Sequence, residues 1–156
     1  MKIAELLNAE RVQLRTDLRS KKRVLEDMGK LLSLGAPGLD ESDIFSTLIG
    51  REKLGSTGMG FGVAIPHGRM QGLERAVGAF MKLSPGVDYE SSDGTPADLI
   101  FGLLVPEQAT EQHLLILRRL AEMFTDDTFC AELRAAADGA ALFALLNRYA
   151  PAPEPA

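Results

Sequence analysis

The sequence contains two histidines, and His67 has the setting that best suits chemistry. It lies in the segment AIPHGR, directly after a short apolar run. Pro66 restricts its own backbone and favours an extended conformation at the residue before it, so the exit from the strand is stiff. Gly68 allows the chain to turn sharply or to approach a ligand closely. These neighbours predict a histidine presented at the mouth of a loop.

A glycine-rich segment precedes this histidine. The stretch GSTGMGFG contains glycines at 55, 58, 60 and 62 and the hydroxyl groups of Ser56 and Thr57. Backbone N–H groups in such a segment can converge on an anion, and Arg51 and Arg69 add positive charge nearby in the sequence. An imidazole beside such donors is what phosphoryl transfer to histidine requires. The residues alone leave a second interpretation open, in which His67 is a hydrogen-bonded loop residue without chemistry.

His113 is the second candidate. It falls in the first turn of a helix predicted from Thr110 to Phe124, on one stripe with Leu117 and Leu120. At a helix N-terminus the macrodipole disfavours the imidazolium and favours an adjacent phosphate. The alternative is a hydrogen-bonded histidine at the edge of the core. Because no cysteine or carboxylate stands at ligand spacing with the two histidines, we expect neither a metal nor another cofactor.

The apolar periodicity predicts the elements that position these residues. Helices are predicted at 20–34, from Asp40 towards 55, and at 110–124, 127–137 and 138–149, and strands at 12–14, 63–65, 76–83 and 97–105. The dipeptide Asp93-Gly94 predicts a hairpin, and the uniformly apolar run LIFGLLV predicts a central strand covered on both faces. We therefore expect an α/β fold, a single domain over residues 1–149 with a mixed β-sheet flanked by helices on both faces. The proline-rich tail at 150–156 is expected to be disordered.

Composition limits the classes of partner. The chain has 156 residues, 46% of them hydrophobic, and a formal net charge of −5. This charge argues against nucleic acid as a ligand and favours a partner protein with a basic surface. Cys130, the single cysteine, has no partner for an internal disulfide and is expected to be a small core residue. No apolar run reaches membrane-spanning length and the start does not read as a signal peptide, so we expect a cytoplasmic protein without membrane insertion.

The segment REKLGSTGMGFGVAIPHGR closely resembles the IIA proteins of the bacterial phosphotransferase system, in the mannitol/fructose branch and nearest to the nitrogen-regulatory type. The resemblance extends from the first residues to about Tyr149 and includes the strand ending LLVP and the helix EQHLLILRRLAEMF. It implies a mixed sheet sandwiched by helices. It also implies that this chain is a phosphoryl carrier loaded by a phosphocarrier protein of the HPr or NPr kind, and a regulator of target proteins through its phosphorylation state.

The resemblance carries roles to individual residues. It implies that His67 is the phosphoryl acceptor, that His113 supports it and that Arg51 stabilises the phosphoryl group. The same resemblance places Ser56 and Thr57 close to the phosphoryl group, and Gly68, which allows close approach of a ligand beside His67, is expected to contact it as well. Two other functions stay open: a sugar-specific IIA component that passes phosphate to a IIB domain, and a module that binds an anion or a partner without covalent chemistry.

One position departs from the family pattern. Relatives often carry a polar residue where this chain has Phe61, so Phe61 supplies no side-chain hydrogen bond at the expected pocket rim. With Met59, Val63 and Ile65, this phenylalanine is expected to form an apolar surface around His67. A partner could cover such a surface while the histidine is uncharged, and we expect phosphorylation to release at least one partner.

Overall fold

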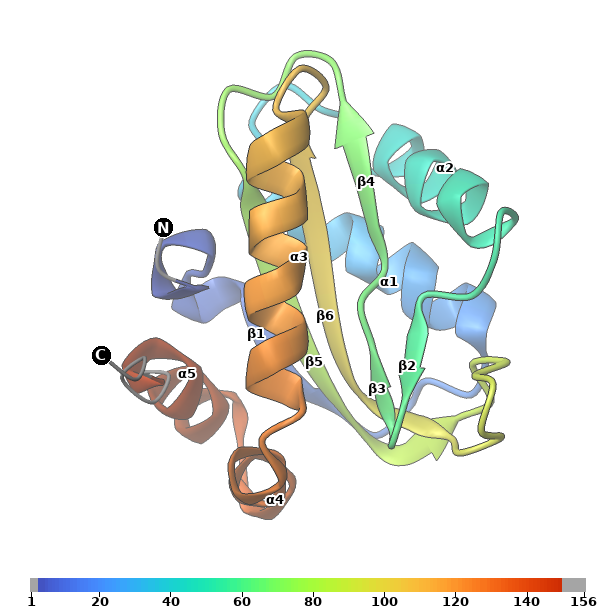
Figure 1. The fold of residues 1–156 in the computed structure, drawn as a ribbon, viewed down its shortest axis with the longest axis vertical. Coiled ribbons are helices and arrows are strands. Elements are labelled where there is room, and N and C mark those ends of the chain that lie inside the picture. The colour runs from blue at the N-terminus through green and yellow to red at the C-terminus, as the bar shows by residue number, and fades with distance from the viewer. Residues whose placement is uncertain (1–2, 150–156) are drawn as a thin grey trace.

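The apolar run LIFGLLV, residues 99–105, forms the centre of the sheet. The computed structural model describes residues 3–149, in which β6 pairs antiparallel with β5 and parallel with both β3 and β4 (Figure 1). Beyond these, β1 pairs parallel with β5, and β2 pairs antiparallel with β3. The strands are β1 (Val12–Arg15), β2 (Gly58–Gly60), β3 (Val63–Ala64), β4 (His67–Met70), β5 (Val77–Val87) and β6 (Ala97–Pro106).

Two helices cover one face of this sheet. α1 (Lys21–Ser33) and α2 (Glu41–Glu52) pack on it, and their buried side chains share one core cluster with residues of β5 and β6. Both helices begin where the sequence predicts, since Ser20 Oγ accepts from Arg23 N and Asp40 Oδ1 accepts from Ser42 N. Each cap satisfies a backbone donor that the first turn leaves free.

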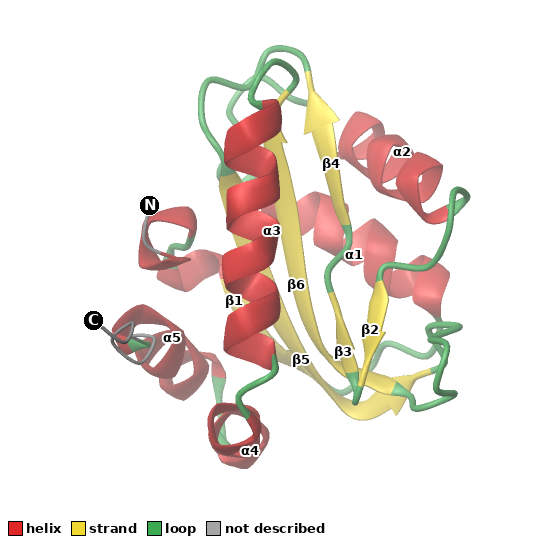
Figure 2. Ribbon diagram, viewed as in Figure 1, coloured by secondary structure: helices red, strands yellow, loops and turns green. Residues whose placement is uncertain are grey.

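The remaining helices cover the opposite face. α3 (Thr110–Phe124) runs along the sheet, with α4 (Asp127–Ala135) and α5 (Gly139–Arg148) beside it (Figure 2). Two 3-10 turns near the N-terminus, Ile3–Leu6 and Ala9–Arg11, lie next to α5. The apolar side chains of these helices and turns pack against residues of the strands in the second core cluster, which includes Cys130 as predicted.

The predicted α/β class is confirmed, and so is a mixed sheet between two layers of helices. The strand predicted at 76–83 continues to Val87, because its pairing with β6 resumes at Val87 and Ala97 after an irregularity. The structure adds two strands that the sequence did not predict, β2 and β4. The predicted tail at 150–156 lies outside the described residues. Over 3–149, no helix has both the length and the apolar composition that crossing a bilayer requires.

Candidate functional site

Strand β4 holds His67 at the edge of the sheet. His67 is its first residue and pairs with Leu103 of β6, while Leu103 N donates to the carbonyl of Pro66 at 3.0 Å. The two residues between β3 and β4 interrupt the ladder, so the chain passes along β6 in two short strands rather than one. The stiff exit predicted from Pro66 therefore places the imidazole on ordered backbone, at the start of a strand.

The imidazole of His67 is fixed in one tautomer. Its Nδ1 lies 2.6 Å from the carbonyl oxygen of Ile65. A carbonyl only accepts, so Nδ1 carries the hydrogen and Nε2 keeps its lone pair. Burial lowers the pKa of His67 below its usual value, and the charge of Arg51 lowers it further, against opposing contributions from the Ile65 hydrogen bond and from Glu52. At neutral pH the ring is uncharged, with Nε2 as its available nucleophile.

His113 lies beside this ring, where the family resemblance implies it. The two ring centroids are 5.4 Å apart, and the planes meet at 67° in an edge-on arrangement. The Nε2 atom of His113 is buried and has no hydrogen-bond partner within residues 3–149. Burial lowers the pKa of His113, and the charges of His67, Arg69 and Arg51 add to this effect. A buried polar atom without a partner is costly, so this nitrogen is suited to a group that enters between the two rings.

Two arginines supply positive charge to the pair of imidazoles. Arg51 lies in the last turn of α2 and acts electrostatically on both histidines, while its Nη1 donates to the carbonyl of Gly55 at 2.8 Å. Arg69, two residues beyond His67, donates from Nη1 to Thr110 Oγ1 at 3.4 Å at the start of α3. The arrangement joins a neutral nucleophile to fixed cations, which is the electrostatic setting for an oxyanion.

Glu52, which the sequence analysis did not single out, anchors the segment that follows α2. Its side chain is 5% exposed and forms an ion pair of 2.9 Å with Lys21 Nζ. The same carboxylate accepts hydrogen bonds from Tyr89 Oη at 3.0 Å, from Thr57 N at 3.1 Å and from the hydroxyl group of Thr57. Burial and the charge of Glu52 raise the pKa of Tyr89, so the phenol stays protonated as a donor. The sequence signal was the adjacent Arg51-Glu52 pair, of which only the arginine was assigned a role.

The hydroxyl groups of Ser56 and Thr57 are both engaged in hydrogen bonds within the protein. Ser56 Oγ donates to the carbonyl of Tyr89 and accepts from Gly58 N, at 3.2 Å and 3.1 Å. Thr57 is 8% exposed, and its hydroxyl lies between Glu52 and Tyr89. In this state both side chains hold the segment in place, and a contact of either with a bound group stays a prediction.

The glycine-rich segment includes a hairpin, and the N–H groups of Thr57, Gly58 and Phe61 donate to Glu52, Ser56 and Asp93 rather than being free for an anion. Gly58 and Gly60 lie in β2, which pairs with β3, and the carbonyl of Gly62 accepts from Asp98 N and Leu99 N. Gly60 and Gly62 both have positive φ, which an L side chain rarely adopts. These glycines therefore shape the tight connection between the two strands.

Gly68 permits close packing of α2 on β4. A Cβ atom at this position would lie 2.5 Å from Thr47 Cγ2. Glycine thus lets the helix that carries Arg51 approach the strand that carries His67. Contact of Gly68 with a bound group stays a prediction.

Phe61 does not lie at the rim of the histidine pair. It is 80% exposed at the β2–β3 turn, where its backbone N donates to Asp93 Oδ2 and its carbonyl accepts from Arg134. Val63 pairs with Leu99 of β6, and His67 pairs with Leu103, four residues further along the same strand. Val63 and His67 are therefore about 13 Å apart along β6.

The prediction that Val63 and Ile65 belong to an apolar surface around His67 is also wrong. Val63 and Ile65 are 2% and 5% exposed, because they contribute to the core. Exposed apolar side chains near the site in sequence are instead Leu54, which follows Arg51 by three residues, and Leu114, next to His113. Their exposures are 84% and 64%.

Within residues 3–149 no group of three or more histidine, cysteine or carboxylate side chains could hold a metal ion.

Comparisons with known proteins show the family to which the chain belongs. The model of the family described as phosphoenolpyruvate-dependent sugar phosphotransferase system, EIIA 2, matches residues 5–149. A curated relative from Pseudomonas aeruginosa, named nitrogen regulatory protein, is 46% identical over 127 residues, which cover 81% of this chain and 82% of the relative.

Solved structures of related proteins have the same fold. The crystal structure of nitrogen regulatory protein IIA-Ntr from Neisseria meningitidis superposes with a TM-score of 0.85 at 42% identity, covering 92% of this chain and 98% of that one. IIA mannitol from Escherichia coli, at 21% identity, shares the fold with a TM-score of 0.75, covering 90% of this chain and 98% of that one. The chain therefore belongs to the EIIA 2 family of the phosphoenolpyruvate-dependent phosphotransferase system.

Proposed function

We propose that this protein is a phosphoryl carrier of the nitrogen-related phosphotransferase system and that His67 Nε2 accepts the phosphoryl group. The observation that carries this proposal is the hydrogen bond of His67 Nδ1 to the Ile65 carbonyl, at 2.6 Å. It leaves the lone pair on Nε2, and the lowered pKa keeps the ring neutral at physiological pH. We place the reaction in the cytoplasm.

The transfer moves a phosphoryl group between two imidazoles. The lone pair of His67 Nε2 attacks phosphorus, and the bond from phosphorus to a nitrogen of the donor histidine breaks with its electron pair staying on that nitrogen. His67 Nδ1 keeps its hydrogen on the Ile65 carbonyl throughout. The positive charge that the ring gains is thereby stabilised by a fixed acceptor.

His113 and Arg51 stabilise the phosphoryl oxygens in this proposal. The buried Nε2 of His113 lacks a partner among the described residues, and an entering oxygen would satisfy it. Arg51 already acts on both imidazoles, and its guanidinium fork matches the spacing of phosphate oxygens. Preorganised donors of this kind are typically worth about 3 kcal/mol each in the transition state.

We propose a phosphocarrier protein of the HPr or NPr kind as the donor, docking around the exposed side chains Leu54 and Leu114. These apolar residues adjoin the cationic Arg51 and the histidine pair in sequence, and each exposes more than half of its surface. The proposal thus combines an apolar contact with positive charge that attracts a phosphorylated partner.

Intact-mass spectrometry tests the carrier proposal. The protein is incubated with phosphoenolpyruvate and the general phosphotransferase proteins, and we expect a single added phosphoryl group that is lost in acid. His67→Ala should fold normally and gain none, whereas Arg148→Gln, a change distant in sequence from the site, should be labelled like the wild type. Absence of labelling in the wild-type protein would leave a non-covalent anion- or partner-binding module as the function.

We further propose that phosphorylation state controls regulatory target proteins, in keeping with the names of the relatives. A phosphoryl group adds close to two negative charges, which are costly to bury in an interface without partner cations. The unphosphorylated form should therefore bind targets that the phosphorylated form releases.

Pull-downs with both forms, analysed by mass spectrometry, test this output. If both forms retain identical partners and a sugar-specific IIB domain removes the phosphate rapidly, the protein is instead a sugar-specific IIA component.

A further inference from the structure

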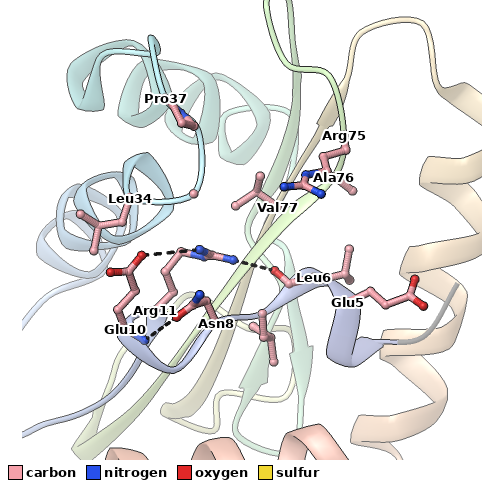
Figure 3. Close-up of a pocket in the computed structure, with 12 residues that line it drawn as sticks. Glu5, Leu6, Asn8, Glu10, Arg11, Leu34, Pro37, Arg75, Ala76 and Val77 are labelled. Atoms are coloured by element: carbon pink, nitrogen blue, oxygen red, sulfur yellow. Dashed lines mark hydrogen bonds and ion pairs between the residues drawn. The ribbon is translucent and has the colours of Figure 1, made fainter.

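A cavity of about 350 Å³ lies on the β1–β5 side of the sheet, separated by β6 from the strand that carries His67. Its walls come from the two N-terminal 3-10 turns, from the turn that follows α1 and from the start of β5 (Figure 3). Two arginines, Arg11 and Arg75, line it together. The proposed phosphoryl chemistry uses neither of them.

Arg11 is a buried cation held mainly by carbonyl groups. The residue is 9% exposed, its Nε donates to the Gly78 carbonyl at 3.0 Å and its Nη2 donates to the Leu6 carbonyl at 3.2 Å. Nη1 has no hydrogen bond in the described part of the chain and is not among the buried atoms, so it faces accessible space. The carboxylate within reach is that of Glu10, 4.0 Å from Nη1, on a side chain that is 56% exposed. The positive charge of Arg11 is therefore neutralised only weakly by the carboxylate of Glu10.

Arg75 brings a second guanidinium group to the same cavity. It has no hydrogen bond or ion pair with any residue in 3–149, and its charge contributes, after burial, to lowering the pKa of Arg11. Figure 3 shows the Arg75 side chain reaching over the cavity towards Arg11, whereas the carboxylate of Glu5 points away. Two cations converging on one space repel each other unless an anion lies between them.

A glycine contributes to the shape of this space. A Cβ atom at Gly35 would lie 2.7 Å from Arg11 Cζ and 2.8 Å from Arg11 Nη1. The backbone after α1 thus packs directly against the guanidinium group, and any side chain there would displace it.

We propose that this cavity binds a small oxyanion between the guanidinium groups of Arg11 and Arg75. Carboxylate and phosphate oxygens share the chemistry that a guanidinium fork recognises, and Arg75 can move onto the anion because no residue in 3–149 holds it. Glu10 competes for Arg11 Nη1 and moves aside when the anion binds. The site does not include His67, so a test of anion binding here is independent of a test of the carrier function.

NMR titration of the ¹⁵N-labelled protein tests the site, with inorganic phosphate and succinate as separate probes at constant ionic strength. We expect saturable shifts of the amides of Gly35, Ala76 and Val77 up to about 50 mM, with a Kd of a few millimolar. The anion with the lower Kd distinguishes a phosphate-bearing from a carboxylate ligand.

Three variants complete the test. Arg75→Gln should raise the Kd by roughly tenfold or more, because one charged fork is lost. Glu10→Gln should lower the Kd, and Arg19→Gln, an exposed arginine that does not line the cavity, should leave it unchanged. The proposal is overturned if neither anion shifts these amides saturably, if Arg75→Gln binds as well as the wild type, or if the shifts are confined to residues around His67.

Discussion

Replacement of Glu52 by glutamine should loosen the segment that joins α2 to the glycine-rich hairpin. The carboxylate binds Lys21 Nζ at 2.9 Å and accepts from Tyr89 Oη and from both donors of Thr57. Glutamine keeps one oxygen, but its NH₂ group must then face a donor or the Lys21 ammonium. Hydrogen bonds to charged groups are worth about 1.5–3 kcal/mol each.

The expected loss follows from how far water can compensate. Breaking a fully buried ion pair by removing one partner costs roughly 3–5 kcal/mol. The Lys21 side chain is 17% exposed, so its ammonium regains part of its hydration when the carboxylate is gone. We therefore expect Glu52→Gln to lower the free energy of unfolding by about 2–3 kcal/mol.

Two measurements test separately the effect of Glu52 on stability and its electrostatic effect on His67. Urea unfolding gives the stability, with Glu132→Gln, an exposed carboxylate on α4, as the matched control that should change it little. Histidine NMR titration gives the pKa of His67, which should fall further in Glu52→Gln because the carboxylate raises it in the wild type. A stability loss below about 1 kcal/mol, or a pKa of His67 that stays the same or rises, would refute the reasoning.

Three further predictions concern neighbouring residues. His113→Ala should fold and still accept phosphate, but about a hundredfold more slowly in single-turnover labelling, and labelling at the wild-type rate would count against its role. Gly68→Ala should lower the free energy of unfolding by about 1–3 kcal/mol in urea melts, because its Cβ would overlap Thr47, and an unchanged midpoint would contradict the packing. The folded-state pKa of His67 lies below the value of about 6.5 expected in the unfolded chain, so the unfolded state binds more protons as pH falls. The stability of wild type relative to His67→Gln should therefore decline as pH falls from about 6.5 through the folded-state pKa, and parallel stability profiles would contradict the shift.

The fold was predictable where local signals agreed with tertiary packing. Helix caps at Ser20 and Asp40 and the apolar run of β6 needed no knowledge of partners, because caps and hydrophobic periodicity are encoded over a few residues. β2 and β4 escaped prediction because they are only three and four residues long and contain glycine, and pairing with neighbouring strands is what makes them strands.

The two histidines of the candidate site were predictable from the sequence, whereas the hydrogen bonds that hold the neighbouring residues in place were not. The spacing on α3 predicted that His113 faces inward, and the family resemblance implied that it shares a site with His67, whose ring lies beside it. The roles of Ser56 and Thr57 in this state depend on Tyr89 and Glu52, which are distant in sequence or were not assigned, so no local pattern shows them. Phe61 was misplaced for the same reason, since the partners that hold its turn, Asp93 and Arg134, come from other segments.

The position of the phosphoryl group on the imidazole tests the central claim most directly. Long-range ¹H–¹⁵N NMR of the protein, before and after phosphorylation by the phosphotransferase proteins, distinguishes the two ring nitrogens of each histidine. We predict that phosphorylation changes the Nε2 resonance of His67 from that of a free lone pair to that of a substituted nitrogen, while Nδ1 keeps its hydrogen on the Ile65 carbonyl. A phosphoryl group on Nδ1 of His67 or on His113, or the absence of any modified imidazole, would contradict it.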